Sequence, residues 1–134
     1  MTDNLLRLEF EEVCKRLVSE NDPTLSEEEL EPSYEILLNF LIRNQHNRQE
    51  IIEFLNAIIR SFRSPQTINS RFFPGMAIAY CMHVLLWQEI YDFALAENKE
   101  FYSRKMQKGM ADILNAYDDD WDDKDLYRRF DVNK

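Results

Sequence analysis

The feature that most narrows the possible folds is a long apolar segment, PGMAIAYCMHVLLWQEIYDFALA, which spans Pro74–Ala96. Between Met76 and Trp87 the one strongly polar side chain is that of His83. A helix that is apolar on nearly all sides is buried on nearly all sides, and a proline suits the first turn of such a helix. The apolar run is too short to cross a bilayer, which takes roughly 20 residues. We therefore predict one central helix, residues 74–97, in a soluble domain.

Other segments carry apolar residues at helical spacing and are predicted to pack around this helix. A first helix is expected to end near Glu20, a second to run over residues 32–44 from Pro32, a third over 47–63, and a later one over 102–117. Two glycines and four prolines are too few for the many turns of a β-sandwich or barrel. We predict a single all-α domain over residues 1–134, with six or seven helices.

The residues just before the predicted second helix are rich in glutamate. Ser26 and Glu29 have the spacing of a capping box, which marks the beginning of a helix. Carboxylates are stabilised near the positive end of a helix. Two interpretations stay open for the acidic residues around this cap: a solvated helix start, or a patch that binds a partner. The residues concerned are Glu27, Glu28 and Glu31.

The charge and the cysteine content limit the partners and the compartment. A net charge of −9 disfavours direct binding of nucleic acid, which needs a basic surface, and favours a basic protein partner. The first residues, MTDNLLRLEFEEV, have no basic segment followed by an apolar core, so no signal peptide is predicted. We expect a cytoplasmic protein in which Cys14 and Cys81 are reduced thiols. Their spacing relative to the two histidines does not fit a zinc site.

The sequence contains no arrangement that indicates an enzyme. His83 lies among apolar residues without an accompanying nucleophile and carboxylate, so it is interpreted as a core histidine. Arg43 and Tyr80 stand three residues before the two histidines, where a metal-binding Glu-x-x-His motif would have glutamate. There is no glycine-rich phosphate loop. We predict no catalytic residue, no bound metal and no cofactor.

The most distinctive local feature is a run of six aspartates between Asp118 and Asp125 that surrounds Trp121. One interpretation is a magnesium-binding Asp-Asp-x-x-Asp string, but the isoprenoid synthases that use it need a larger cavity than this chain can enclose. A second is a solvated run without a role. A third is an edge that binds the arginines and lysines of a partner, with Trp121 as its anchor. The residues of this proposed edge are Asp118, Asp119, Asp120, Trp121, Asp122 and Asp123.

The segment Tyr80–Glu89, YCMHVLLWQE, resembles a Tyr-x-Met-His-x-Leu-Arg-Trp-Pro-Glu pattern of small, acidic, helical bacterial proteins. These are the immunity proteins of contact-dependent growth inhibition and related polymorphic toxin systems. Leu86 and Gln88 depart from the pattern, and the missing proline suggests an unbroken helix through Trp87. The residues that match are Tyr80, Met82, His83, Leu85, Trp87 and Glu89.

The resemblance implies a cytoplasmic protein that is not an enzyme and that binds the toxic domain of a cognate effector, often a nuclease. It also implies that the matching residues are framework, because the toxin-binding face of such proteins varies. The acidic charge agrees with a basic toxin as partner. Two other functions stay open: an acidic helical adaptor or regulator, and a small magnesium-dependent nucleotide hydrolase.

Overall fold

The computed structural model of the chain describes residues 2–22, 24–61, 74–100 and 111–130, and in these residues all regular structure is helical. The predicted all-α class is therefore confirmed. The α-helices are α1 (Thr2–Glu20), α2 (Glu27–Arg43), α3 (Arg48–Ser61), α5 (Gly75–Leu85) and α6 (Gln88–Glu100), and the 3-10 helices are η1 (Gln45–Asn47) and η2 (Asp122–Leu126). Residues 111–115 are also helical. Most of the helix predicted over 102–117 lies outside the described residues.

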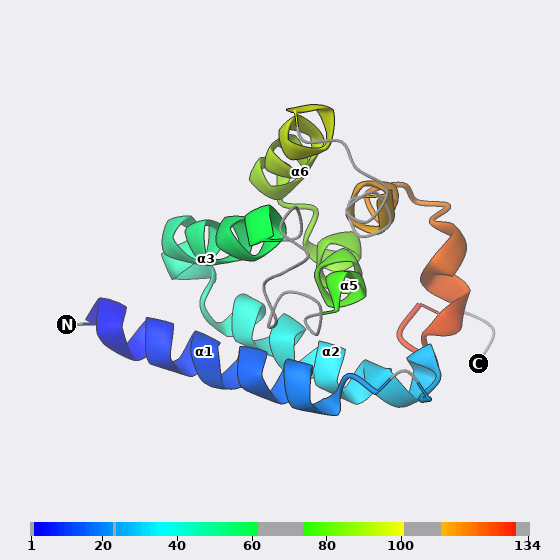
Figure 1. Cartoon of the computed structure of the whole chain (residues 1–134), viewed down its shortest axis with the longest axis horizontal. Coiled ribbons are helices and arrows are strands. Elements are labelled where there is room, and N and C mark those ends of the chain that lie inside the picture. Colours follow the sequence, from blue (N-terminus) through cyan, green and yellow to red (C-terminus); the bar gives the residue numbers. More distant parts are fainter. Residues whose placement is uncertain (1, 23, 62–73, 101–110, 131–134) are drawn as a thin grey trace.

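Two pairs of helices pack together, α1 with α2 and α3 with α6. Helix α5 packs on α2 and is followed along the chain by α6. In Figure 1, α1 and α2 lie side by side along one edge, and α5 packs on α2 while α6 packs on α3. The segment that follows residue 111 returns to the beginning of α2, so that residues 127–130 lie beside it (Figure 1). None of the helices in the described residues is both long enough and apolar enough to span a membrane.

The start of α2 differs from the prediction. The second long helix was expected to begin at Pro32, but α2 begins at Glu27, directly after the N-cap Ser26. The hydroxyl of Ser26 accepts the N–H of Glu29 at 3.2 Å, and the Glu29 carboxylate accepts the N–H of Ser26 at 3.1 Å. This confirms the capping box. Because the cap satisfies the first N–H groups, the helix begins there, and Pro32 lies inside its second turn.

The central helix is not continuous, which corrects the prediction of one helix over residues 74–97. Leu86 adopts a left-handed conformation, with φ 53° and ψ 42°, and its N–H donates to the carbonyl of Met82 at 2.8 Å. A left-handed residue ends a helix, and for a non-glycine residue it costs about 1–2 kcal/mol. The next residue, Trp87, is 2% exposed, and its carbonyl accepts the hydroxyl of Tyr117 at 2.6 Å. Burial of the indole ring offsets the strained backbone.

The core is apolar and lies where α2, α3 and α5 meet. The stripe of α1 predicted from its spacing is buried against it, and the ring of Phe10 lies 5.7 Å from that of Phe40 and 5.1 Å from that of Phe54. Eight large side chains at the centre have no measurable exposure: Leu37, Leu38, Phe40, Leu41, Ile51, Leu55, Ile59 and Ile78.

Both cysteines are free thiols within this helical packing. Cys81 is buried in α5, and Cys14 is half-buried on α1. Burial, with a smaller effect from the negative charge of Glu11, raises the pKa of Cys14 to about 12. Burial also raises the pKa of Cys81 well above its usual value. Neither thiol is ionised near neutral pH, so neither has the character of a reactive nucleophile.

Candidate functional site

The aspartate run forms a compact turn that leads into η2. The Asp118 carboxylate accepts the N–H of Asp120 at 2.9 Å, and the ammonium of Lys124 donates to the carbonyl of Asp119 at 3.1 Å. Lys124 also lies 3.7 Å from the carboxylate of Asp120, whose side chain is 96% exposed. Five aspartates of the run, including Asp125, are exposed, and we call the first four of them the acidic edge: Asp118, Asp119, Asp120 and Asp122. Asp123 is half-buried.

Trp121 lies beneath this turn, which contradicts its predicted role as an anchor for a partner. Its side chain is only 2% exposed. The indole ring lies 5.1 Å from the ring of His83 and stacks on that of Tyr127 at 6.0 Å. A tryptophan that is already buried contributes its apolar area to the fold, so little is left to bury against a partner. The acidic edge therefore has carboxylates outside and Trp121 inside.

The arrangement of the aspartates bears on the magnesium interpretation. Among the described residues, no group of three or more His, Cys, Asp or Glu side chains is placed so that it could hold a metal ion. Within the string, Asp119 and Asp120 are exposed, whereas Asp123 is half-buried.

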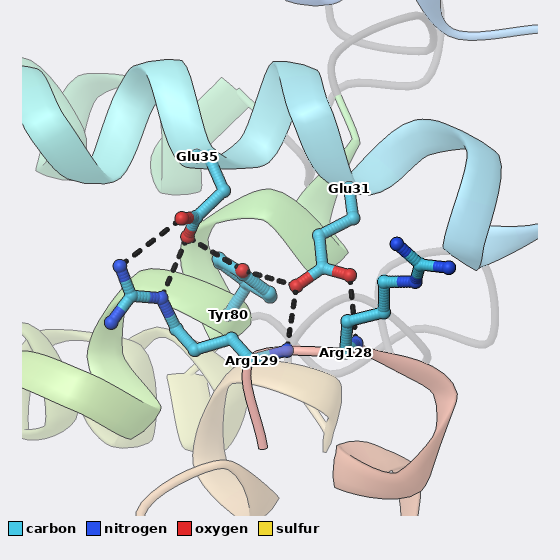
Figure 2. Close-up of polar contacts among 5 residues, drawn as sticks. All are labelled: Glu31, Glu35, Tyr80, Arg128 and Arg129. Carbon is cyan, nitrogen blue, oxygen red and sulfur yellow. Dashed lines mark hydrogen bonds and ion pairs between the residues drawn. The ribbon is translucent and has the colours of Figure 1, made fainter. Parts of the chain in front are cut away.

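The acidic residues at the start of α2 separate into two groups. Glu28 and Glu29 are exposed, whereas Glu31 is 6% exposed. The Glu31 carboxylate accepts the hydroxyl of Tyr80 at 2.6 Å and the main-chain N–H groups of Arg128 and Arg129 at 2.8 and 3.2 Å. Figure 2 shows these contacts converging on it. Glu31 is thus engaged within the fold, which corrects its assignment to a partner-binding patch.

Glu27 is engaged in a similar way, and it too is corrected. It is half-buried, and its carboxylate accepts the hydroxyl groups of Tyr34 at 3.1 Å and Tyr127 at 2.6 Å. Burial, together with the adjacent Glu27 carboxylate, raises the pKa of both tyrosines far above the usual value. Both hydroxyls are therefore protonated near neutral pH and donate to Glu27.

Glu35 completes this set and was not singled out from the sequence. Its carboxylate accepts the hydroxyl of Tyr80 at 2.6 Å and both the Nε and an Nη of Arg129, at 2.7 and 3.1 Å (Figure 2). Partial burial alone would raise the pKa of Glu35, but the hydrogen bonds from Arg129 and Tyr80 and the charge of Arg129 outweigh it and lower that pKa. The spacing of Glu27, Glu31 and Glu35 at four-residue intervals places them on one face of α2.

The residues that match the Tyr80–Glu89 pattern lie in the interior or at helix junctions. Tyr80, Met82 and Trp87 are buried, and Leu85 is half-buried against the core. Nδ1 of His83 donates to the carbonyl of Ala116 at 2.6 Å, so this half-buried histidine is engaged within the fold.

The last residue of the pattern, Glu89, joins α6 to α3. It forms an ion pair with Arg48, whose guanidinium lies 5.0 Å above the ring of Trp87. The hydrogen bond of Glu89 to its own N–H, followed by the bond from Arg48, lowers the pKa of this carboxyl. All six matching residues therefore contact other parts of the fold.

An open groove of about 700 Å³ runs between the first turns of α2 and residues 128–129. Half of its lining residues are acidic and two are cationic; the lining comprises Ser26, Glu28, Glu29, Glu31, Pro32, Glu35, Arg128 and Arg129. Arg128 lies 3.4 Å from the Glu28 carboxylate. The groove is thus formed by the start of α2 and by the segment of residues 111–130, which also carries the acidic edge.

Comparisons with protein-family models, with curated proteins and with solved structures found no match for this chain. The candidate site therefore rests on its own geometry. It has an exposed part, the acidic edge with Glu28 and Glu29, and an interior part, in which Glu27, Glu31 and Glu35 hold residues 127–129.

Proposed function

We propose that this protein is a cytoplasmic immunity protein that binds and neutralises a basic toxin domain through its acidic edge. The observation that carries the proposal is the group of four exposed carboxylates on the outside of one turn. These side chains need not leave any buried contact to meet a partner. A nuclease that grips phosphate has a basic cleft, and carboxylates of this kind form bidentate pairs with arginine.

The resemblance of Tyr80–Glu89 to immunity proteins supports the same function. Its residues make contacts that hold helices together, as framework residues should, and they leave the acidic edge free to vary. The net charge of −9 adds a long-range attraction to a basic partner, which speeds association more than it strengthens the final complex.

Growth protection tests the proposal. Expression of the toxin domain encoded by the adjacent gene should stop the growth of cells that lack this protein, and co-expression should restore growth. The two proteins should copurify, with a dissociation constant of about 1 nM, or about −12 kcal/mol. If the neighbouring protein is harmless, or kills equally well in the presence of this protein, the immunity function is wrong and an adaptor function replaces it.

The role of the acidic edge is tested separately by charge neutralisation. Replacing Asp118, Asp119, Asp120 and Asp122 with asparagine should slow association with the toxin about tenfold or more at low salt and flatten its salt dependence. A matched control replaces four exposed carboxylates elsewhere with glutamine: Glu11, Glu12, Glu20 and Glu53. Equal effects of the two variants would mean that net charge alone, and not this edge, guides the encounter.

A further inference from the structure

Residues Tyr127–Phe130, which we call the C-terminal latch, follow η2 and are attached to α2 by side-chain carboxylates. Two successive main-chain N–H groups of the latch donate to the Glu31 carboxylate. Main-chain N–H groups in helices and sheets usually pair with carbonyl oxygens, which do not titrate. Here their acceptor is an ionisable side chain, so the attachment of the main chain depends on the charge of Glu31.

The side chains of the latch are held in the same way. Arg129 forms a two-point contact with Glu35, and the hydroxyl of Tyr127 donates to Glu27 at 2.6 Å. A weaker contact joins Arg128 to Glu28, whose side chain is half exposed. All four acceptors lie on α2 between its first residue and Glu35, so one short stretch of helix holds the latch.

The latch covers aromatic rings of α5. The ring of Tyr80 lies 4.9 Å from that of Tyr127 and 5.0 Å from that of Phe130, and the ring of His83 lies 4.8 Å from that of Phe130. Removal of the latch would uncover this face of α5. The core at the meeting point of α2, α3 and α5 is built instead mainly from aliphatic side chains, such as Leu37, Leu55 and Ile78, which do not titrate.

We propose that the C-terminal latch is a releasable device that opens as a unit when the carboxylates on α2 are neutralised, while the helices remain folded. A protonated carboxyl is a poorer acceptor than a carboxylate and no longer attracts Arg129. Loss of the Glu31 charge weakens both main-chain bonds together, because one group serves both. Opening exposes the aromatic face of α5 and frees the carboxylates of α2.

The pH dependence of latch opening depends on all the ionisable groups around the latch. From α2 they are Glu27, Glu28, Glu31, Tyr34 and Glu35; from α5 Tyr80, Cys81 and His83; from the helical residues 111–115 Asp112; and from the latch and the preceding turn Asp123, Tyr127, Arg128 and Arg129. The pKa of Glu35 is lowered in the folded protein. Its contribution is therefore complete above the usual value of about 4.3 and is lost as the pH falls through the lowered value.

Hydrogen exchange of the full-length protein tests the latch. In Glu31→Gln, the Arg128 and Arg129 amides should lose protection by about tenfold or more, because the glutamine amide places a donor where an acceptor is needed. Amides in the middle of α2 and α5 should keep their protection. The control is Glu53→Gln, which removes the same charge from an exposed carboxylate on α3 and should change the Arg128 and Arg129 amides by less than about twofold.

Two further measurements keep the proposal falsifiable. If Glu31→Gln does not fold, Glu35→Gln replaces it, and this variant should reduce protection at Arg129 with an unchanged far-ultraviolet circular dichroism spectrum. In the wild type, lowering the pH from about 7 to about 3 should shift the amide resonances of Arg128 and Arg129 before helical circular dichroism is lost. Unchanged protection in the variants, or loss of the latch and the helices in a single step, would overturn the proposal.

Discussion

The apolar core and the C-terminal latch are held by different kinds of contact. In the core, side chains such as Leu38 and Ile78 have no exposed surface, and their stabilisation comes from burial, which is indifferent to pH. In the latch, the hydrogen bonds and ion pairs to α2 described above end on carboxylates, and they are short and directional; one further contact joins the rings of Tyr34 and Tyr127 at 5.9 Å. One helix, α2, thus packs into the core through its apolar face and binds the C-terminal latch through its acidic face.

The largest effect on stability is expected from a substitution in the apolar core. Leu38→Ala should destabilise the protein by about 2–5 kcal/mol, because it removes buried methyl groups and leaves a cavity. Denaturant unfolding should show the same loss at pH 7 and at mildly acidic pH. A loss below about 1 kcal/mol would mean that the core around α2 is loosely packed.

The next largest effect on stability is expected at the carboxylates of α2 that hold the latch. Tyr80→Phe removes the hydroxyl whose single proton is shared between Glu31 and Glu35, and it should cost about 1–3 kcal/mol near neutral pH. Because the folded-state pKa of Glu35 is lowered, the cost should be complete above about pH 4.3 and shrink as the pH falls further. Unfolding measured as a function of pH checks this. A cost that is the same at every pH would contradict a carboxylate-based attachment.

A smaller effect tests the beginning of α2, on which both faces depend. Ser26→Ala removes the side-chain half of the capping box and should cost about 1 kcal/mol. Ser19→Ala is a suitable control, because the hydroxyl of Ser19 bonds only a carbonyl near the end of α1. Thermal unfolding of the two variants should differ clearly, and equal midpoints would indicate that α2 does not need its cap.

The smallest effect concerns the acidic edge. Asp119→Asn should change the free energy of unfolding by less than about 0.5 kcal/mol, because this carboxylate is exposed. If the chemical denaturation curve of this variant overlays that of the wild type, the acidic edge does not contribute to the stability of the fold, whereas the core and the latch do. A substantial change in either direction would show that the edge contributes to folding as well as to the proposed encounter with a partner.

Much of the fold could be predicted from local patterns, because periodicity and capping residues act over one or two helical turns. The stripe of α1 and the Ser26–Glu29 box are of this kind. The return of residues 127–129 to α2 could not be predicted, since Arg128 and Glu31 are 97 residues apart and no local pattern links them. The burial of Glu31 beside the exposed Glu28 follows only from that return. A usable signal was present in the spacing of Glu27, Glu31 and Glu35, which flank the apolar face of one helix.

The left-handed residue Leu86 has a consequence for which sequences this fold can accept. Because α6 begins at Gln88, that residue occupies the first helical position, where a proline fits without loss of a hydrogen bond. Trp87, which lies between the two helices, is where a residue before proline belongs. The pattern that Tyr80–Glu89 resembles has its proline at the position of Gln88, where this junction should accept one. Position 86 should in turn accept glycine or asparagine, whose backbones enter the left-handed region most readily.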